Sequence, residues 1–127
     1  DYIGISIDGS PDVHDAFRGL KGSFVESMKA VDLLNSFGKT KVGIRFTITK
    51  DTYDDLAFIF ELAEKHNIPK VYISHLVYSG RGLENLEMDL TKEQRITAVE
   101  YILDKAFEYH ETGRDIEIVT GNMEMDA

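Results

Sequence analysis

Apolar residues in this chain fall into short alternating runs separated by longer amphipathic segments. Ile3, Ile5 and Ile7 alternate with small or polar residues, a period of two that is typical of a strand. The same criterion predicts four strands, over residues 2–7, 42–48, 71–77 and 116–119.

Three helices are predicted between these strands. They run over 24–37, from Asp51 or Thr52 to about 66, and from 92 to about 112. Ser23 with Glu26 and Thr91 with Gln94 match capping boxes, while Gly38 and Gly113 supply left-handed stops. Residues 8–22, rich in Asp, Gly and Ser, are expected to be a long ordered connection.

Alternating strands and helices predict an α/β fold with a parallel sheet of about four βα units. By pattern alone, half of a (β/α) barrel and a small open doubly wound sheet are equally allowed. The first strand begins one residue from the start of the sequence, so we expect residues 1–127 to be a single-domain piece of a longer protein.

Composition narrows the function classes. The formal net charge of -9 argues against sequence-independent nucleic-acid binding, which needs clustered Lys and Arg. With no cysteine, the chain has no thiolate zinc site, cysteine nucleophile or thiolate-ligated cluster of its own. We expect a cytoplasmic protein without a membrane span or signal peptide, because no apolar run is long enough for either. The four histidines lack metal-ligand spacing and are expected to be surface or structural residues.

Polar residues follow the predicted strands, at the edge where parallel α/β sheets bind ligands. The candidates are Ser6, Asp8, Thr47, Thr49, His75, Tyr78 and Thr120. The alternative is local: Ser6 and Thr47 satisfy nearby backbone groups, and Asp8 forms an Asx-turn with Gly9.

Two arginines are candidates for binding an anion. Arg45 interrupts an apolar strand, where a charge needs a bidentate anionic ligand, an ion pair or a route to water. Arg81 lies between Gly80 and Gly82, in a loop that suits close approach to a carboxylate or phosphate but is not a Walker motif.

Two stretches carry a family resemblance. Residues 2–9, YIGISIDG, followed by 14–19, HDAFRG, resemble the fourth barrel strand and loop of radical S-adenosylmethionine (SAM) enzymes with SPASM-type extensions. Residues 72–82, YISHLVYSGRG, are more specifically similar to the haem d1 and alternative haem biosynthesis branch. The resemblance spans essentially the whole chain and implies a partial barrel that lacks its cluster-binding segment.

The resemblance also implies roles. Such enzymes hold a [4Fe-4S] cluster on an upstream cysteine loop and cleave SAM to a 5'-deoxyadenosyl radical. The implied cofactor-binding residues are Ser6, Asp8, Arg18, Leu76 and Val77. We further infer that Arg45, Thr47, His75, Tyr78 and Arg81 bind the substrate, which we expect to be a carboxylated tetrapyrrole.

Other interpretations stay open at this point. The parent protein could mature a peptide, as SPASM-type enzymes do, or the chain could be a non-catalytic small-molecule-binding module. An isolated piece would also expose the edge of its first strand, which favours dimerisation through that edge.

Overall fold

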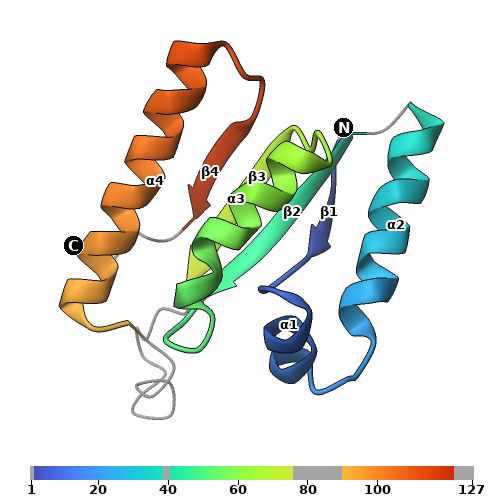
Figure 1. Ribbon diagram of the computed structural model, residues 1–127, viewed down its shortest axis with the longest axis horizontal. Helices are drawn as coiled ribbons and strands as arrows, with labels where there is room; N and C mark the ends of the chain where they lie inside the picture. Colours follow the sequence, from blue (N-terminus) through green and yellow to red (C-terminus); the bar gives the residue numbers. More distant parts are fainter. Residues whose placement is uncertain (1, 39–40, 76–89, 122–127) are drawn as a thin grey trace.

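The computed structural model describes residues 2–38, 41–75 and 90–121 (Figure 1). Strands and helices alternate along the chain. Their bounds are β1 (Tyr2–Ser6), α1 (Pro11–Arg18), α2 (Ser23–Phe37), β2 (Lys41–Ile48), the 3-10 turn η1 (Tyr53–Asp55), α3 (Leu56–Lys65), β3 (Lys70–His75), α4 (Lys92–Thr112) and β4 (Glu117–Gly121).

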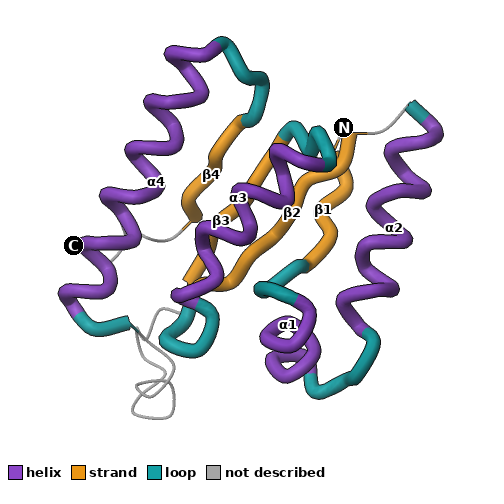
Figure 2. The backbone as a smooth tube through the Cα atoms, viewed as in Figure 1, coloured by secondary structure: helices purple, strands orange, loops and turns teal. Residues whose placement is uncertain are grey.

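The four strands form one parallel sheet in the order β1-β2-β3-β4, which is also their order in the chain (Figure 2). Right-handed crossovers between strands that follow one another in this order place every helix on the same face. A doubly wound sheet has helices on both faces because its strand order reverses. The sheet is therefore a half barrel, and the α/β prediction is confirmed.

The core lies between the sheet and α2, α3 and α4. Val42, Ile44, Phe46 and Ile48 alternate along β2 and are buried, together with neighbours from β3 and the helices. Burying such side chains contributes roughly 1.5–3 kcal/mol each. The hydrophobic effect therefore fixes which face of the sheet meets the helices.

The intervening residues define the opposite side of the sheet, which we call the open face. Strand register places on it Tyr2, Gly4, Ser6, Lys41, Gly43, Arg45, Thr47, Lys70, Tyr72, Ser74, Glu117 and Val119. In a complete barrel this side faces the interior.

Helices α3 and α4 contact each other through aromatic side chains and through one partly buried cluster of polar side chains. Glu64 accepts hydrogen bonds from the Tyr109 hydroxyl at 2.6 Å and from Lys105 Nζ at 3.0 Å. The Phe60 ring lies 5.8 Å from that of Tyr101, between centroids. These contacts fix the position of α4 along α3.

One predicted connection contains a helix. Residues 11–18 form α1, a helix that the prediction of a long ordered connection over 8–22 does not include. Pro11 occupies the first turn, where its missing N–H costs nothing, and Gly19 ends the helix with a φ of 70°.

The two predicted capping boxes have different outcomes. At α4 the box is confirmed, since the Thr91 hydroxyl accepts from the Gln94 amide and the Gln94 side chain accepts from the Thr91 amide. At α2 it is wrong, because Ser23 already lies within the helix and Gly22 is the N-cap. The left-handed stops at Gly38 and Gly113 are confirmed.

The remaining boundaries shift slightly. The second predicted helix starts as η1 before α3. Thr52 is at the N-cap position of η1, but its hydroxyl donates to the Thr47 carbonyl and makes no cap hydrogen bond. The third strand is described from Lys70 to His75. Among the helices described, none is long and apolar enough to cross a membrane.

Candidate functional site

The candidate site lies at the carboxyl ends of β1 and β2, where α1 closes over the sheet (lower part of Figure 1). Asp8 is at its centre, two residues beyond β1, with a side chain that is 0% exposed. A carboxylate buried this deeply is costly unless every oxygen has a donor. The surrounding residues supply those donors.

Both oxygens of Asp8 are engaged. Oδ1 accepts from the Thr47 amide at 3.1 Å, which ties the end of β1 to β2. Oδ2 accepts from Arg18 Nε at 2.8 Å and lies 2.7 Å from Arg18 Nη2. The predicted Asx-turn does not account for Asp8, because its carboxylate reaches across to a strand and a helix. The side chain is also fully buried, and a role for Asp8 in cofactor binding stays a prediction.

His14 supports the same residue through the backbone. Its Nδ1 accepts the Asp8 amide at 2.9 Å, so the ring proton of the neutral imidazole is on Nε2, which lies 3.1 Å from the Ser23 hydroxyl. Burial lowers the pKa of His14, while the nearby carboxylate of Asp8 partly opposes that shift. His14 is thus the structural histidine that the sequence predicts.

Asp15 connects α1 to α2. Its carboxylate accepts the Gly22 amide at 2.9 Å and the Phe24 amide at 2.8 Å. These two backbone hydrogen bonds hold the pKa of Asp15 below its usual value. Asp15 therefore supplies from the preceding helix the cap that the sequence assigns to Ser23, a long-range contact that no local spacing predicts.

Gly9 makes the turn between β1 and α1 possible. Its φ of 151° is rarely adopted by other residues, and an added Cβ would lie 2.7 Å from both Asp55 Oδ2 and Val13 Cγ1. Asp55 also accepts the Ser10 amide at 2.7 Å, linking the start of α1 to η1.

The remaining predicted residues divide into three groups. Ser6 and Thr47 are half-buried on the open face near Asp8. Arg45 lies on the same face and is exposed, so it incurs no cost of a buried charge; its stem crosses Gly4 and its guanidinium lies 5.9 Å from the Tyr72 ring. His75 ends β3, opposite Ile48 in register, but its side chain lies outside the described residues, as do Leu76, Val77, Tyr78 and Arg81.

The amino end of the open face carries a second cluster, which sequence analysis missed. Lys70 Nζ lies 4.2 Å from the Tyr2 ring centroid, 4.9 Å from that of Tyr72 and 3.6 Å from Glu117 Oε1. Lys41 Nζ lies 5.9 Å from the Tyr2 ring. In the sequence, this cluster is visible only as Lys and Tyr residues near the starts of the strands. Their proximity becomes clear only when the pairing of the strands is known.

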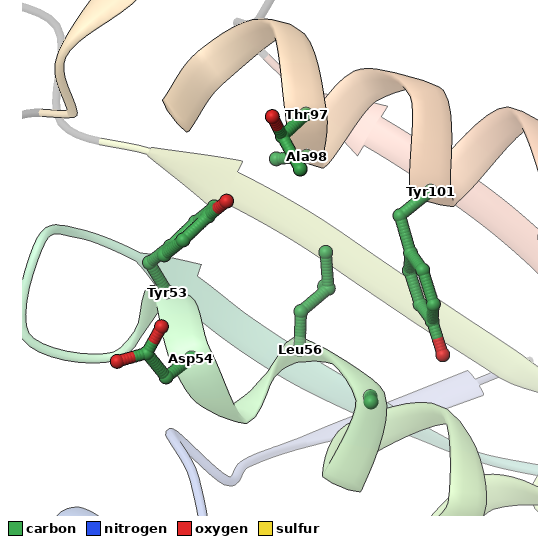
Figure 3. A pocket seen from close by; sticks show the side chains of 7 residues that line it. Tyr53, Asp54, Leu56, Thr97, Ala98 and Tyr101 are labelled. Atoms are coloured by element: carbon green, nitrogen blue, oxygen red, sulfur yellow. The ribbon is translucent and has the colours of Figure 1, made fainter. Parts of the chain in front are cut away.

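A shallow pocket lies away from this face, between η1, α3 and α4 (Figure 3). Its volume is about 200 Å³. Its lining residues are Tyr53, Asp54, Leu56, Ala57, Thr97, Ala98 and Tyr101. None of the predicted site residues lines it. A separate hollow of about 220 Å³ lies between α1 and Asp51 and Thr52, next to the candidate site.

Metal ligation does not arise from the described part of the chain. No cluster of three or more His, Cys, Asp or Glu side chains suited to an ion occurs among residues 2–38, 41–75 and 90–121. Because the full sequence has no cysteine, an iron–sulfur cluster cannot take thiolate ligands from it.

Comparison with known proteins identifies relatives across the whole chain. The chain is 38% identical over 126 residues to the Fe-coproporphyrin III synthase of Methanosarcina barkeri, covering 99% of this chain and 31% of that protein. It is 40% identical over 128 residues to the pre-heme d1 synthase of Dinoroseobacter shibae, covering 100% of this chain and 31% of that protein. The resemblance to radical SAM enzymes of the haem branch is confirmed. The chain spans about a third of the length of these relatives.

Solved structures show the same fold. Native anSMEcpe with bound AdoMet and the Kp18Cys peptide matches with a TM-score of 0.74 and 18% identity, over 92% of this chain and 33% of that one. At that identity the match shows the partial-barrel fold alone. No family model matches the chain.

Proposed function

We propose that this chain is the central barrel segment of a radical SAM enzyme that modifies tetrapyrrole side chains in haem d1 or haem biosynthesis. The observation that carries the proposal is the similarity of the whole chain to two proteins named for Fe-coproporphyrin III and pre-heme d1 synthesis. The half barrel agrees with it, because its open face ends in polar residues at the edge where parallel α/β sheets bind ligands.

The residues at the carboxyl end fit S-adenosylmethionine. Its methionyl carboxylate calls for a guanidinium, and Arg18 is 40% exposed beside Asp8. The half-buried Ser6 hydroxyl can hydrogen-bond the methionyl or ribose oxygens. By resemblance, the backbone near Leu76 and Val77 flanks the adenine. With a [4Fe-4S] cluster held by cysteines outside this chain, SAM supplies a radical that takes hydrogen from the substrate.

The substrate side of the proposal rests on charge. Tetrapyrroles of this branch carry several carboxylates, and Arg45 presents a cation on the open face of a protein whose net charge is -9. Thr47 lies between Arg45 and the end of β2. His75 is the last residue of β3, and Tyr78 and Arg81 come after it in sequence. We assign these five residues to substrate binding.

The proposal includes four wider features. Residues 1–127 act as part of one domain, the protein works in the cytoplasm, and nucleic acid is not a partner. Within the described residues the outer edge of β1 has no partner strand, so an isolated 127-residue piece is expected to dimerise through it. Sedimentation of that piece at several concentrations tests the last point.

The deciding experiment uses the protein encoded by the complete reading frame, reconstituted with iron and sulfide without oxygen. Electron paramagnetic resonance is expected to show a reducible [4Fe-4S] signal that changes when SAM is added. Incubation with an iron porphyrinoid should then yield 5'-deoxyadenosine and an altered side chain. Turnover of a peptide alone would reassign the substrate, and the absence of a cluster would leave only a binding module.

A further inference from the structure

The way in which Asp8 contacts Arg18 leaves part of the guanidinium available. Arg18 uses Nε and Nη2 on the single oxygen Oδ2, so it meets Asp8 with one side of its planar group. The second N–H of Nη2 and one N–H of Nη1 point out from the end of the group, while the other N–H of Nη1 points back along the side chain. No acceptor for them occurs within residues 2–38, 41–75 and 90–121, and the side chain is 40% exposed. The end-on fork matches a carboxylate.

Asp8 is itself held rigidly. Its backbone is fixed by the Asp8 N–H···His14 Nδ1 hydrogen bond, and its other oxygen is fixed by the Thr47 amide. The distance from His14 Nδ1 to Asp8 Oδ2 is 3.9 Å, so the imidazole supports the backbone of Asp8 and leaves its carboxylate to Arg18. A long arginine side chain would otherwise sample many rotamers at the surface.

We infer that Asp8 is a positioning residue, which holds the guanidinium of Arg18 at the carboxyl end of the sheet with its end-on fork free for the carboxylate of a ligand. This inference rests on the proposed function, which supplies the methionyl carboxylate of SAM as that ligand. Asp8 acts through Arg18 and does not touch the ligand.

Asp8→Asn separates this role from simple folding. The amide keeps the size of the side chain and an oxygen for the Thr47 amide, but it turns a donor toward Arg18. Arg18 would then adopt the orientation that binds SAM only part of the time. The apparent affinity for SAM falls in proportion to the population of that orientation, about tenfold here. Asp15→Asn is the matched control, because it also removes a carboxylate from this region. The Asp15 carboxylate accepts the backbone amides of Gly22 and Phe24 and makes no contact with Arg18.

Two ligands provide a readout that a general loss of structure would not reproduce. Equilibrium dialysis of the complete reconstituted protein would compare SAM with 5'-methylthioadenosine, which keeps the nucleoside but lacks the methionyl carboxylate. Asp8→Asn is expected to weaken the binding of SAM about tenfold and to leave the affinity for 5'-methylthioadenosine unchanged. In an Arg18→Met background, Asp8→Asn should cause no further loss, because the two act as one unit.

The outcomes are distinct. Equal weakening of both ligands, or an additive loss in the double variant, overturns the positioning role while the proposed function stands. Failure of the wild-type protein to bind SAM overturns both. Where Asp8→Asn does not fold, Arg18→Lys gives the decision. An ammonium keeps the charge but has no rigid fork whose side can stay on Asp8 while its end meets a ligand carboxylate, so a loss restricted to SAM supports the inference and an unchanged SAM affinity overturns it.

Discussion

At the amino end of the open face, cationic side chains lie on aromatic rings, whereas at its carboxyl end an arginine lies on a buried carboxylate. Lys70 is surrounded by Tyr2, Tyr72 and Glu117, so its charge is satisfied within the sheet. Arg18 meets Asp8 with one side only and keeps donors exposed. Both ends carry positive charge in an acidic chain, but of Lys70 and Arg18 the arginine is the one that keeps donors available to a ligand.

The difference shows how much order each end requires. The amino-end cluster needs only strand register, since matching positions on adjacent strands bring the side chains together. The carboxyl end depends on a glycine turn, a short helix and a buried histidine. A site that must hold a cation in one orientation therefore depends on more structural elements than a cluster whose charges are paired within the sheet.

The largest expected effect comes from Gly9→Ala at the carboxyl end. The new methyl group would meet Asp55 and Val13 at a backbone angle that alanine disfavours, so the free energy of unfolding should fall by about 2–3 kcal/mol. Gly19→Ala is the control, since nothing lies within 4 Å of its added Cβ and only its φ of 70° is unfavourable. Its loss should be about 1 kcal/mol. Urea denaturation followed by circular dichroism measures both, and equal losses would show that the Gly9 turn is not specially constrained.

Acidification is the next expected effect, and it should act on the carboxyl end through His14. Because burial holds the pKa of His14 in the folded protein below the ordinary value of 6.5, the unfolded chain takes up the proton first as pH falls. The stability contribution is therefore complete above that value and is lost as pH drops toward the folded pKa. The charges that face the ring are Asp8, Asp15 and Arg18.

Urea midpoints measured through this window should decline with falling pH in the wild type. The decline should flatten in His14→Asn, where an amide oxygen can replace Nδ1 as acceptor without titrating. His66→Asn is the control, because His66 is partly exposed, with Nδ1 3.8 Å from Asp32 Oδ1, and lies outside this network. An unchanged slope in His14→Asn would assign the pH dependence to other groups.

The sequence predicts the sheet better than it predicts the site. Alternation in β2 identifies the buried set Val42, Ile44, Phe46 and Ile48, because burial on one face imposes a period of two. Strand order depends on tertiary pairing, so half barrel and doubly wound sheet could not be separated until the register was known. The short helix α1 was missed although Pro11 and Gly19 mark its ends.

The site illustrates why local spacing reaches a limit. Thr91 and Gln94 cap α4 as their spacing predicts, because both partners belong to one turn. Ser23 has equally good spacing, yet its hydroxyl lies by His14 and the amides of Gly22 and Phe24 go to Asp15. The contact between Asp8 and Arg18 spans ten residues and requires α1, a helix that the composition of the segment conceals.

The smallest effects should come from the lysines at the amino end, and Lys70→Met tests the other half of the comparison. The change removes the contacts of Lys70 Nζ with Tyr2, Tyr72 and Glu117 while keeping an apolar stem, so the urea midpoint should fall by less than in Gly9→Ala. Lys41→Met should have less effect still, because its single ring contact is 5.9 Å long. In the complete reconstituted protein neither change should alter SAM affinity in equilibrium dialysis. A loss of SAM binding in Lys70→Met would show that the amino-end cations also serve the ligand, and the division between a structural end and a binding end would then fail.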